Sequence, residues 1–280
     1  MIVDAQVHIW VHSTPQRPWV PGVTWAPQLG PLSRREDFTA DDLLREMDEA
    51  GVDGAVLVPP GALEGYRNDL ALEAVRRNPQ RFAAMGQVDF RLPDARERLE
   101  ELLVEPRMRG MRISLPGDNS GEPFHQRKMG WVFQMIEQSG KPLMLYAPED
   151  LDLVEEIAQK HPTLEMALCH MALLRQDAGK PVTPRIEPLV KLARYPNIAV
   201  KATALSMQSQ QPFPFADVHE ALQRTLEAYG PERVFWGTDM TRLACSYRES
   251  KEFFFAMPFL KGRDRELVMG EALKKWLRWK

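Results

Sequence analysis

Short apolar runs alternate with amphipathic stretches along almost the whole chain. The runs lie at residues 1–10, 52–58, 81–88, 110–115, 142–146, 164–170, 197–203 and 234–236. Apolar runs of this length are typical of strands buried on both faces, as in a parallel sheet. The pattern therefore predicts about eight buried strands.

Helix signals occupy the stretches between these runs. Thr39 and Asp42 have the spacing of a capping box, and the apolar Phe38 stands directly before it. The helix they predict runs from Leu43 to Ala50 and ends at Gly51. Further helices are predicted at residues 66–77, 131–138, 151–159 and 216–229, after Pro93 and Pro184, and over the tail from 263 to 279.

Strict alternation of strands and helices implies parallel pairing, and about eight such units close a barrel. We therefore predict an α/β protein whose single domain, residues 1–280, is a (β/α)₈ TIM barrel. An open doubly wound sheet is the alternative, but no Gly-x-Gly-x-x-Gly turn follows any of the runs. The 280 residues, 44% of them hydrophobic, are enough for one such core.

A long connection follows the first strand. From His12 to Asp37 the chain is rich in proline and tryptophan and shows no clear periodicity. Loops of this length in compact domains are usually functional or disordered. Because Trp10, Trp19 and Trp25 favour an ordered segment, we predict a lid over the site.

Charge and composition narrow the range of partners. The net charge of -3 and the absence of a long basic run argue against nucleic acid. No apolar stretch approaches the roughly 20 residues that span a bilayer, so no membrane partner is expected. Cys169 and Cys245 are the only cysteines, which favours a reducing, cytoplasmic location. A small, anionic molecule is the expected substrate, and a homo-oligomer stays open.

Polar residues stand at the ends of the predicted strands. In a barrel, the carboxyl ends of all strands face one pocket. The residues at those ends are His8, Arg112, Tyr146, His170, Lys201 and Asp239. We expect them to meet at the mouth of the barrel.

Each of these residues also has a structural interpretation. Asp239 could cap the following helix or pair with Arg242, and each histidine could be an ordinary hydrogen-bonding residue. Arg112 could pair with a neighbouring carboxylate, Tyr146 could belong to the core, and Lys201 could extend to the rim. The recurrence of polar residues around one predicted ring favours a functional site.

These residues resemble the amidohydrolase-related family, in the branch that holds pyrone dicarboxylate lactonase, L-fuconolactonase-like enzymes and several aromatic-acid decarboxylases. The resemblance covers nearly the whole chain and rests on five motifs. They are Val3-Asp-Ala-Gln-Val-His-Ile-Trp10, Gly110-Met-Arg-Ile113, Leu168-Cys-His-Met171, Val200-Lys201 and Trp236-Gly-Thr-Asp239. In that family the first strand usually carries His-x-His, the sixth ends in His and the eighth in Asp. The candidate metal ligands that match are His8, His170 and Asp239.

Two positions depart from the family pattern. Gln6 stands where the first His is usual, and Tyr146 where a fifth-strand His is frequent. An amide oxygen is a poor zinc ligand compared with an imidazole. The resemblance therefore implies either no required cofactor or one weakly held zinc or manganese ion.

The resemblance implies acid–base hydrolysis of a small, carboxylated lactone or ester. Asp239, His170 and His8 are the predicted catalytic residues. The predicted substrate-binding residues are Arg112, Tyr146, Lys201, Arg242, Trp10 and Gln6. A metal-dependent decarboxylase of an aromatic or related acid and a non-catalytic barrel that only binds a small acid are the alternatives.

Overall fold

A computed structural model of the chain describes residues 1–23, 35–115, 129–243 and 245–280. Within them one eight-stranded parallel sheet runs in sequence order. Its strands are β1 (Val3–Val7), β2 (Gly54–Leu57), β3 (Phe82–Gly86), β4 (Met108–Ser114), β5 (Leu143–Tyr146), β6 (Met166–Leu168), β7 (Ile198–Thr203) and β8 (Val234–Gly237). β8 lies against β1, and the nearly closed barrel confirms the predicted TIM fold over the open sheet.

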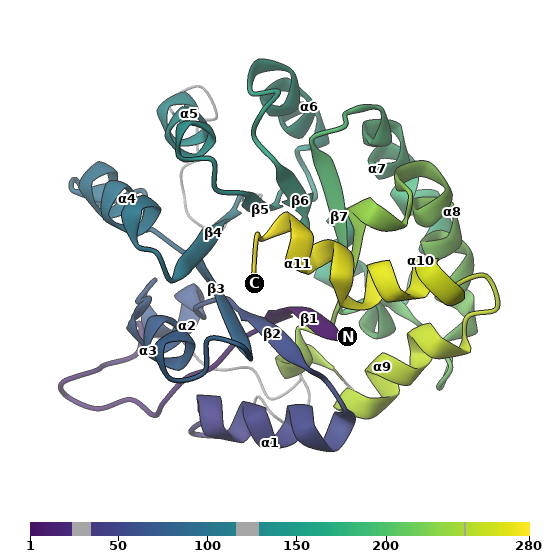
Figure 1. Ribbon diagram of the computed structural model, residues 1–280, viewed down its shortest axis with the longest axis horizontal. Helices are drawn as coiled ribbons and strands as arrows, with labels where there is room; N and C mark the ends of the chain where they lie inside the picture. Colours follow the sequence, from purple (N-terminus) through teal and green to yellow (C-terminus); the bar gives the residue numbers. More distant parts are fainter. Residues whose placement is uncertain (24–34, 116–128, 244) are drawn as a thin grey trace.

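Helices surround the sheet, as Figure 1 shows. They are α1 (Ala40–Ala50), α2 (Gly61–Glu64), α3 (Asp69–Arg77), α4 (Ala95–Val104), α5 (Gly130–Ser139), α6 (Leu151–Lys160), α7 (Glu187–Lys191), α8 (His219–Tyr229), α9 (Tyr247–Ala256), α10 (Gly262–Glu266) and α11 (Ala272–Trp276). The longest has 11 residues, and none in the described part of the chain is long and apolar enough to cross a membrane.

Both predicted caps of α1 are confirmed. Thr39 and Asp42 form the predicted reciprocal capping box, and Gly51 ends α1 in the left-handed conformation. The helix predicted from residue 66 begins instead at Asp69, because Tyr66 has a φ of 63° and cannot start a right-handed helix.

The predicted tail helix is also divided. Its backbone leaves the helical conformation at Gly270, between α10 and α11. A Cβ on Gly270 would lie 2.7 Å from the backbone nitrogen of Val3, so only glycine allows β1 to approach this closely. The tail thereby reaches the amino-terminal mouth of the barrel, where α11 crosses in front of the strands (Figure 1).

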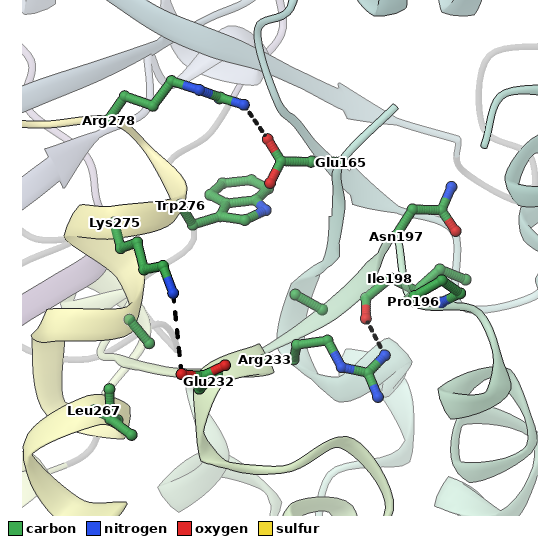
Figure 2. A pocket seen from close by; sticks show the side chains of 12 residues that line it. Glu165, Pro196, Asn197, Ile198, Glu232, Arg233, Leu267, Lys275, Trp276 and Arg278 are labelled. Atoms are coloured by element: carbon green, nitrogen blue, oxygen red, sulfur yellow. Dashed lines mark hydrogen bonds and ion pairs between the residues drawn. The ribbon is translucent and has the colours of Figure 1, made fainter. Parts of the chain in front are cut away.

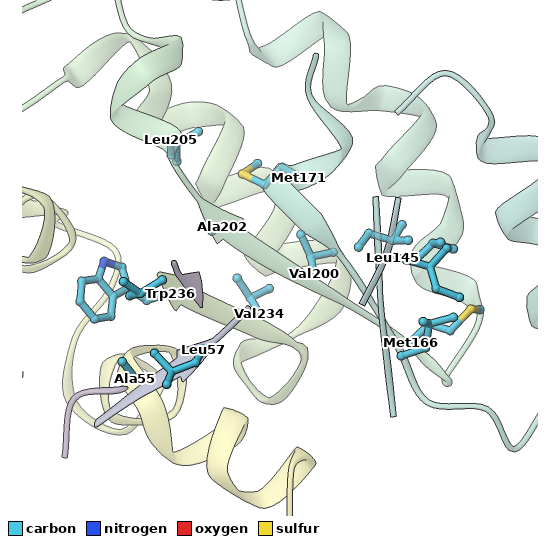
Figure 3. Packing of buried hydrophobic residues seen from close by; sticks show 14 of the residues in the cluster. Ala55, Leu57, Leu145, Met166, Met171, Val200, Ala202, Leu205, Val234 and Trp236 are labelled. Carbon is cyan, nitrogen blue, oxygen red and sulfur yellow. The ribbon is translucent and has the colours of Figure 1, made fainter. Parts of the chain in front are cut away.

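Side chains alternate between the two faces of each strand, and this separates two hydrophobic clusters. On β7, Val200 and Ala202 belong to the larger cluster, which also includes Leu145 and Trp236 (Figure 3). Ala199 belongs to the smaller cluster, which joins inward-facing strand residues to the end of the chain. Because side chains alternate along a strand, the neighbours of Ala199 on its own face are Lys201 and then Thr203. This face leads to the site.

Candidate active site

Asp239 lies two residues after the end of β8 and is wholly buried. Its backbone nitrogen donates to the carbonyl oxygen of Gln6 at 2.9 Å, which joins the end of β8 to β1. The strands come this close because residue 237 is glycine. A Cβ there would lie 2.6 Å from Cγ2 of Thr203 and 2.8 Å from the backbone nitrogen of Ala5.

The Asp239 carboxylate faces two histidines. Its Oδ1 lies 3.1 Å from Nε2 of His8, and its Oδ2 lies 3.7 Å from Nε2 of His170. All three side chains come from the carboxyl ends of strands, as the sequence predicted. The structure therefore brings the three predicted catalytic residues together at one mouth of the barrel.

The backbone at these residues is strained. Asp239 has a φ of 48°, and His170, Met171 and Ala172 have φ values of 57°, 53° and 53°. Left-handed backbone at a residue other than glycine costs of order 1–3 kcal/mol and concentrates at functional sites. The strain at both strand ends supports a functional rather than a structural role for Asp239 and His170.

The hydrogen bonds of His8 locate a proton. Nδ1 of His8 lies 2.7 Å from the carbonyl oxygen of Val58, which can only accept, so Nδ1 carries a hydrogen. Nε2 is then the ring nitrogen that faces Oδ1 of Asp239, at 3.1 Å.

His170 has its own supporting hydroxyl. Oγ1 of Thr203 lies 2.7 Å from Nδ1 of His170, on the side of the ring away from Asp239. The ring of Tyr146 meets the ring of His170 edge to face, with centroids 5.4 Å apart. Two neighbours therefore fix the orientation of this imidazole.

Arg112 lies next to these rings. Its Cζ is 5.7 Å from the centroid of the Tyr146 ring. One terminal nitrogen donates to the carbonyl of Ile113 at 2.7 Å and to Oγ of Ser114 at 2.6 Å. Its Nε has no hydrogen-bond partner among the described residues. The guanidinium is thus held on one edge, beside the Tyr146 ring.

Gln6 and Lys201 meet one layer deeper in the barrel. Nζ of Lys201 donates to Oε1 of Gln6 at 2.5 Å, and both side chains are buried. Gln6 and His8 do share the barrel interior, as their spacing predicted. Lys201 is wholly enclosed, so its predicted contact with substrate stays a prediction, and so does that of Gln6.

Asp4 stabilises the backbone of β1 next to Gln6 by hydrogen bonds. Its Oδ1 accepts hydrogen bonds from the backbone nitrogens of Gln6 and Thr238, and its Oδ2 accepts one from the Thr238 hydroxyl. The pairing register of β1 shifts between Asp4 and Val7. Irregularities of this kind re-aim side chains near active sites. Asp4 therefore fixes how Gln6 and His8 enter the barrel.

Two other predicted residues lie elsewhere or are not described. Trp10 is wholly buried against Phe38, with ring centroids 5.3 Å apart, and their backbones form a two-way bridge. The bridge closes the base of the long connection after β1. The side chain of Arg242 is outside what the structure describes, although its backbone belongs to a 3₁₀ turn, Met240–Arg242. Both substrate roles stay predictions.

The lid is described only in part. Residues 24–34, which include Trp25, lie outside the described residues. Before them, Val20 donates to the carbonyl of Leu63 in α2, and Arg17 pairs with Glu64 and Asp69. This segment therefore packs on the connections that follow β2, and the lid itself stays a prediction.

Sequence reasoning missed Thr203 and the Val58 carbonyl. It chose Lys201 as the polar residue at the end of the seventh strand, although the predicted run and β7 both continue to Thr203. The signal was available, because Thr203 lies two residues after Lys201 and shares its face. No sequence signal marks a backbone carbonyl.

The chain matches a known protein family over nearly its whole length. The amidohydrolase family model matches residues 3–272. The chain belongs to the amidohydrolase family. Among amidohydrolase relatives, the 4-sulfomuconolactone hydrolase of Hydrogenophaga intermedia is 27% identical over 207 residues, which are 72% of this chain and 65% of that protein. The L-fucono-1,5-lactonase of Burkholderia ambifaria is 22% identical over 253 residues, which are 86% of this chain and 81% of that protein.

Solved amidohydrolase structures share the fold. An amidohydrolase from Burkholderia multivorans with bound zinc superposes with a TM-score of 0.76 at 20% identity, and the match covers all of both chains. Decarboxylases are also among the solved structures with this fold. At this identity the likeness establishes the fold alone.

The residues of this amidohydrolase that could hold a divalent ion are His8, His170 and Asp239. In the described residues, no three His, Cys, Asp or Glu side chains are grouped to hold a metal. His8, His170 and Asp239 offer two imidazoles and one carboxylate. The amide oxygen of Gln6 is a weak ligand and already accepts a hydrogen bond from Lys201.

A separate cavity of about 280 Å³ lies at the opposite end of the barrel (Figure 2). Glu165 and Glu232 line it, and they pair with Arg278 and Lys275. Arg233 donates to backbone carbonyls, among them that of Ile198 at 2.9 Å. Because these charged side chains pair with one another, the Asp239 site and not this cavity is the candidate active site.

Proposed function

We propose that this chain hydrolyses a small, carboxylated lactone or ester by acid–base catalysis. The observation that carries the proposal is the buried Asp239 carboxylate between the Nε2 atoms of two histidines, at 3.1 and 3.7 Å. The lactone-hydrolysing activities named for two relatives support the choice of substrate class.

Asp239 supplies the base in this proposal. Asp239 acts as a carboxylate and takes a proton from the attacking water. The hydroxide adds to the lactone carbonyl, and the tetrahedral intermediate then breaks its acyl carbon–oxygen bond. The leaving alkoxide takes the proton back from Asp239, which gives a ring-opened hydroxy acid. Such acid–base assistance contributes roughly 10²- to 10⁴-fold.

His170 and His8 surround the reacting group. An imidazole N–H directed at the developing oxyanion is worth about 10²- to 10³-fold. The Thr203 hydroxyl at Nδ1 and the Tyr146 ring hold His170 for this task. Orientation by fixed neighbours lowers the reorganisation that the reaction requires.

Arg112 supplies the anion site. A guanidinium can bind a carboxylate with two parallel hydrogen bonds. One edge of Arg112 is fixed by Ile113 and Ser114, so the group is already oriented before substrate binds. Its place beside Tyr146, whose ring contacts that of His170, supports this role.

A substrate panel tests the proposal. Wild-type protein would be assayed with carboxylated lactones, with neutral lactones and with aromatic carboxylic acids. Ring opening of a carboxylated lactone, lost in Asp239→Asn, is the expected result. Release of CO₂ from an aromatic acid without any ring opening would replace hydrolysis by decarboxylation. Saturable binding of acids without turnover would indicate a non-catalytic barrel.

A further inference from the structure

Glu64 is a buried acid that the proposed mechanism does not use. It lies at the end of α2, and its exposed fraction is 2%. Its Oε2 pairs with Nη2 of Arg17 at 2.5 Å, and its Oε1 accepts a hydrogen bond from the backbone nitrogen of Val11 at 3.2 Å. A buried carboxylate is stable only when such partners replace its lost hydration. Glu64 therefore holds two points of the connection that follows β1.

Arg17 is presented to Glu64 by a turn of its own. The backbones of Thr14 and Arg17 bond to each other in both directions, at 3.1 Å each. The guanidinium also donates to both carboxylate oxygens of Asp69, at 2.5 and 3.1 Å. Arg17 thus bridges the end of α2 and the start of α3, beside which Figure 1 shows the purple segment after β1. Because the acid of this ion pair is buried, water and salt screen the pair little.

The Val11 bond closes a ring that contains His8. On one side of the ring, the chain runs from His8 to Val11. On the other side, Val58 follows β2, and two prolines, residues 59–60, and α2 lead to Glu64. Two hydrogen bonds join the sides: Nδ1 of His8 to the Val58 carbonyl at 2.7 Å, and the Val11 nitrogen to Glu64. Prolines have a fixed φ, and the Glu64 nitrogen donates back to the carbonyl of the second proline at 2.9 Å. The second side is therefore stiff, and Glu64 sets how His8 meets Val58.

We propose that Glu64 is a positioning residue for His8, and that its ion pair with Arg17 couples the docking of the connection after β1 to the orientation of His8. Arg17 keeps the carboxylate buried, and the carboxylate holds Val11. Without Arg17 the buried charge has no cationic partner, which draws the carboxylate toward water and away from Val11. The ring then loosens around His8. The proposal rests on the proposed function only for the catalytic task of His8.

Urea unfolding of a double-mutant cycle tests the coupling of the pair. The cycle compares wild type, Arg17→Met, Glu64→Gln and the double variant. Arg17→Met leaves a buried carboxylate without its cation, so its unfolding equilibrium constant should rise roughly 100-fold or more. Glu64→Gln keeps an amide oxygen for Val11 and should raise the constant much less. The double variant buries no charge, so it should be roughly 10-fold or more stable than Arg17→Met alone.

The ring N–H of His8 reports its position without any assay of activity. In ¹⁵N-edited NMR spectra, the Nδ1–H signal of His8 is assigned by its loss in His8→Gln. Arg17→Met and Glu64→Met should shift or broaden this signal, because both release Val11. Glu64→Gln should preserve it. In the first two variants kcat for lactone hydrolysis should fall roughly 10-fold with KM nearly unchanged, and Glu64→Gln should stay near the wild-type rate.

Glu137→Met is the matched control. The Glu137 carboxylate also accepts a hydrogen bond from a backbone nitrogen, that of Thr163 at 3.1 Å, and it pairs with His161 at 2.8 Å. These residues lie before the start of β6, at the amino-terminal end of the barrel. This variant should lose stability and leave both the His8 signal and kcat unchanged.

Two outcomes would overturn the proposal. One is a His8 signal that keeps its wild-type position in folded Glu64→Met. The other is additive losses of stability in Arg17→Met and Glu64→Gln, which would show that the two residues act independently. Glu64→Asp, which retracts the carboxylate from both partners, replaces a Glu64→Met that fails to fold, and Arg17→Lys likewise replaces Arg17→Met. If wild type hydrolyses nothing, the proposed function fails, whereas the NMR and unfolding measurements still decide the role of Glu64.

Discussion

Thr203 and His170 form a contact that joins β7 to the candidate active site: Oγ1 of Thr203 lies 2.7 Å from Nδ1 of His170. Both side chains are buried. The hydroxyl leaves Nε2 as the ring nitrogen that faces Asp239. The contact therefore sets which nitrogen of His170 is available for chemistry.

Removing this hydroxyl should slow the reaction. Thr203→Val keeps the shape of the side chain but loses a hydrogen bond worth about 1–2 kcal/mol, so we expect kcat to fall roughly 5- to 30-fold. Thr203→Ser, which keeps the hydroxyl, should restore most of the rate. Steady-state kinetics on the best lactone substrate would measure both.

Thr225→Val provides the matched control for this prediction. Thr225 is another buried threonine, and its hydroxyl donates to the carbonyl of Ala221 within α8. This variant should lose some stability and keep its kcat. Equal losses of kcat in Thr203→Val and Thr225→Val would mean that Thr203 acts only through folding.

Arg112 should decide the preference for charged substrates. Arg112→Met removes a charge-assisted bidentate contact. We expect KM for a carboxylated lactone to rise roughly 30- to 1,000-fold, which corresponds to a loss of about 2–4 kcal/mol in binding free energy. Neutral lactones should be much less affected. Arg112→Lys keeps the charge but lacks the two parallel N–H donors of the guanidinium, so it should give an intermediate KM.

The exposed Arg98, which pairs with Asp94 on the surface, supplies the control. Arg98→Met should change neither substrate class. If Arg112→Met raises KM equally for charged and neutral substrates, the contacts of Arg112 with Ile113 and Ser114 are structural and the anion site lies elsewhere.

Asp4 should leave a signature in the pH dependence of stability. Burial raises the pKa of Asp4 from 3.8 to about 6, against the lowering effect of its hydrogen bonds to Thr238 and Gln6. The folded state therefore binds this proton more tightly than the unfolded state. Its contribution to the free energy of unfolding is greatest below about pH 4, decreases up to about pH 6 and stays low above it.

The comparison of wild type with Asp4→Asn isolates this contribution. Between about pH 4 and pH 7, wild type should lose up to about 3 kcal/mol more unfolding free energy than the variant, because asparagine does not titrate. Urea unfolding at several pH values would measure the difference. Parallel pH profiles for the two proteins would show that Asp4 titrates alike in the folded and unfolded states.

The sequence predicted most of the barrel because its signals are local. Alternating apolar runs locate the strands, and the capping box at Thr39 and Asp42 forms as its spacing predicts. Convergence of His8, His170 and Asp239 follows from parallel pairing, since all three stand at the same end of their strands. The break in the tail at Gly270 depends on contact with Val3, which is distant in sequence and has no local signal.

The details of the site depend on depth within the barrel, which the sequence does not show. Lys201 was placed at the rim with the other polar residues, although two further residues of β7 lie beyond it. The left-handed backbone at His170 and Asp239 also has no signal, because neither is glycine. The packing of Trp10 against Phe38 likewise joins residues distant in sequence and has no local signal.

Asp239 carries the central prediction. Asp239→Asn keeps the size of the side chain but cannot take a proton from water, so kcat should fall on the order of 10²-fold or more with KM nearly unchanged. Asp94→Asn, an exposed acid on the barrel surface, should keep the wild-type rate. Kinetics and thermal unfolding together separate the two roles, because a folded but slow Asp239→Asn indicates acid–base catalysis. A variant that unfolds, or that retains most of its kcat, would make Asp239 a structural residue at the β8–β1 junction.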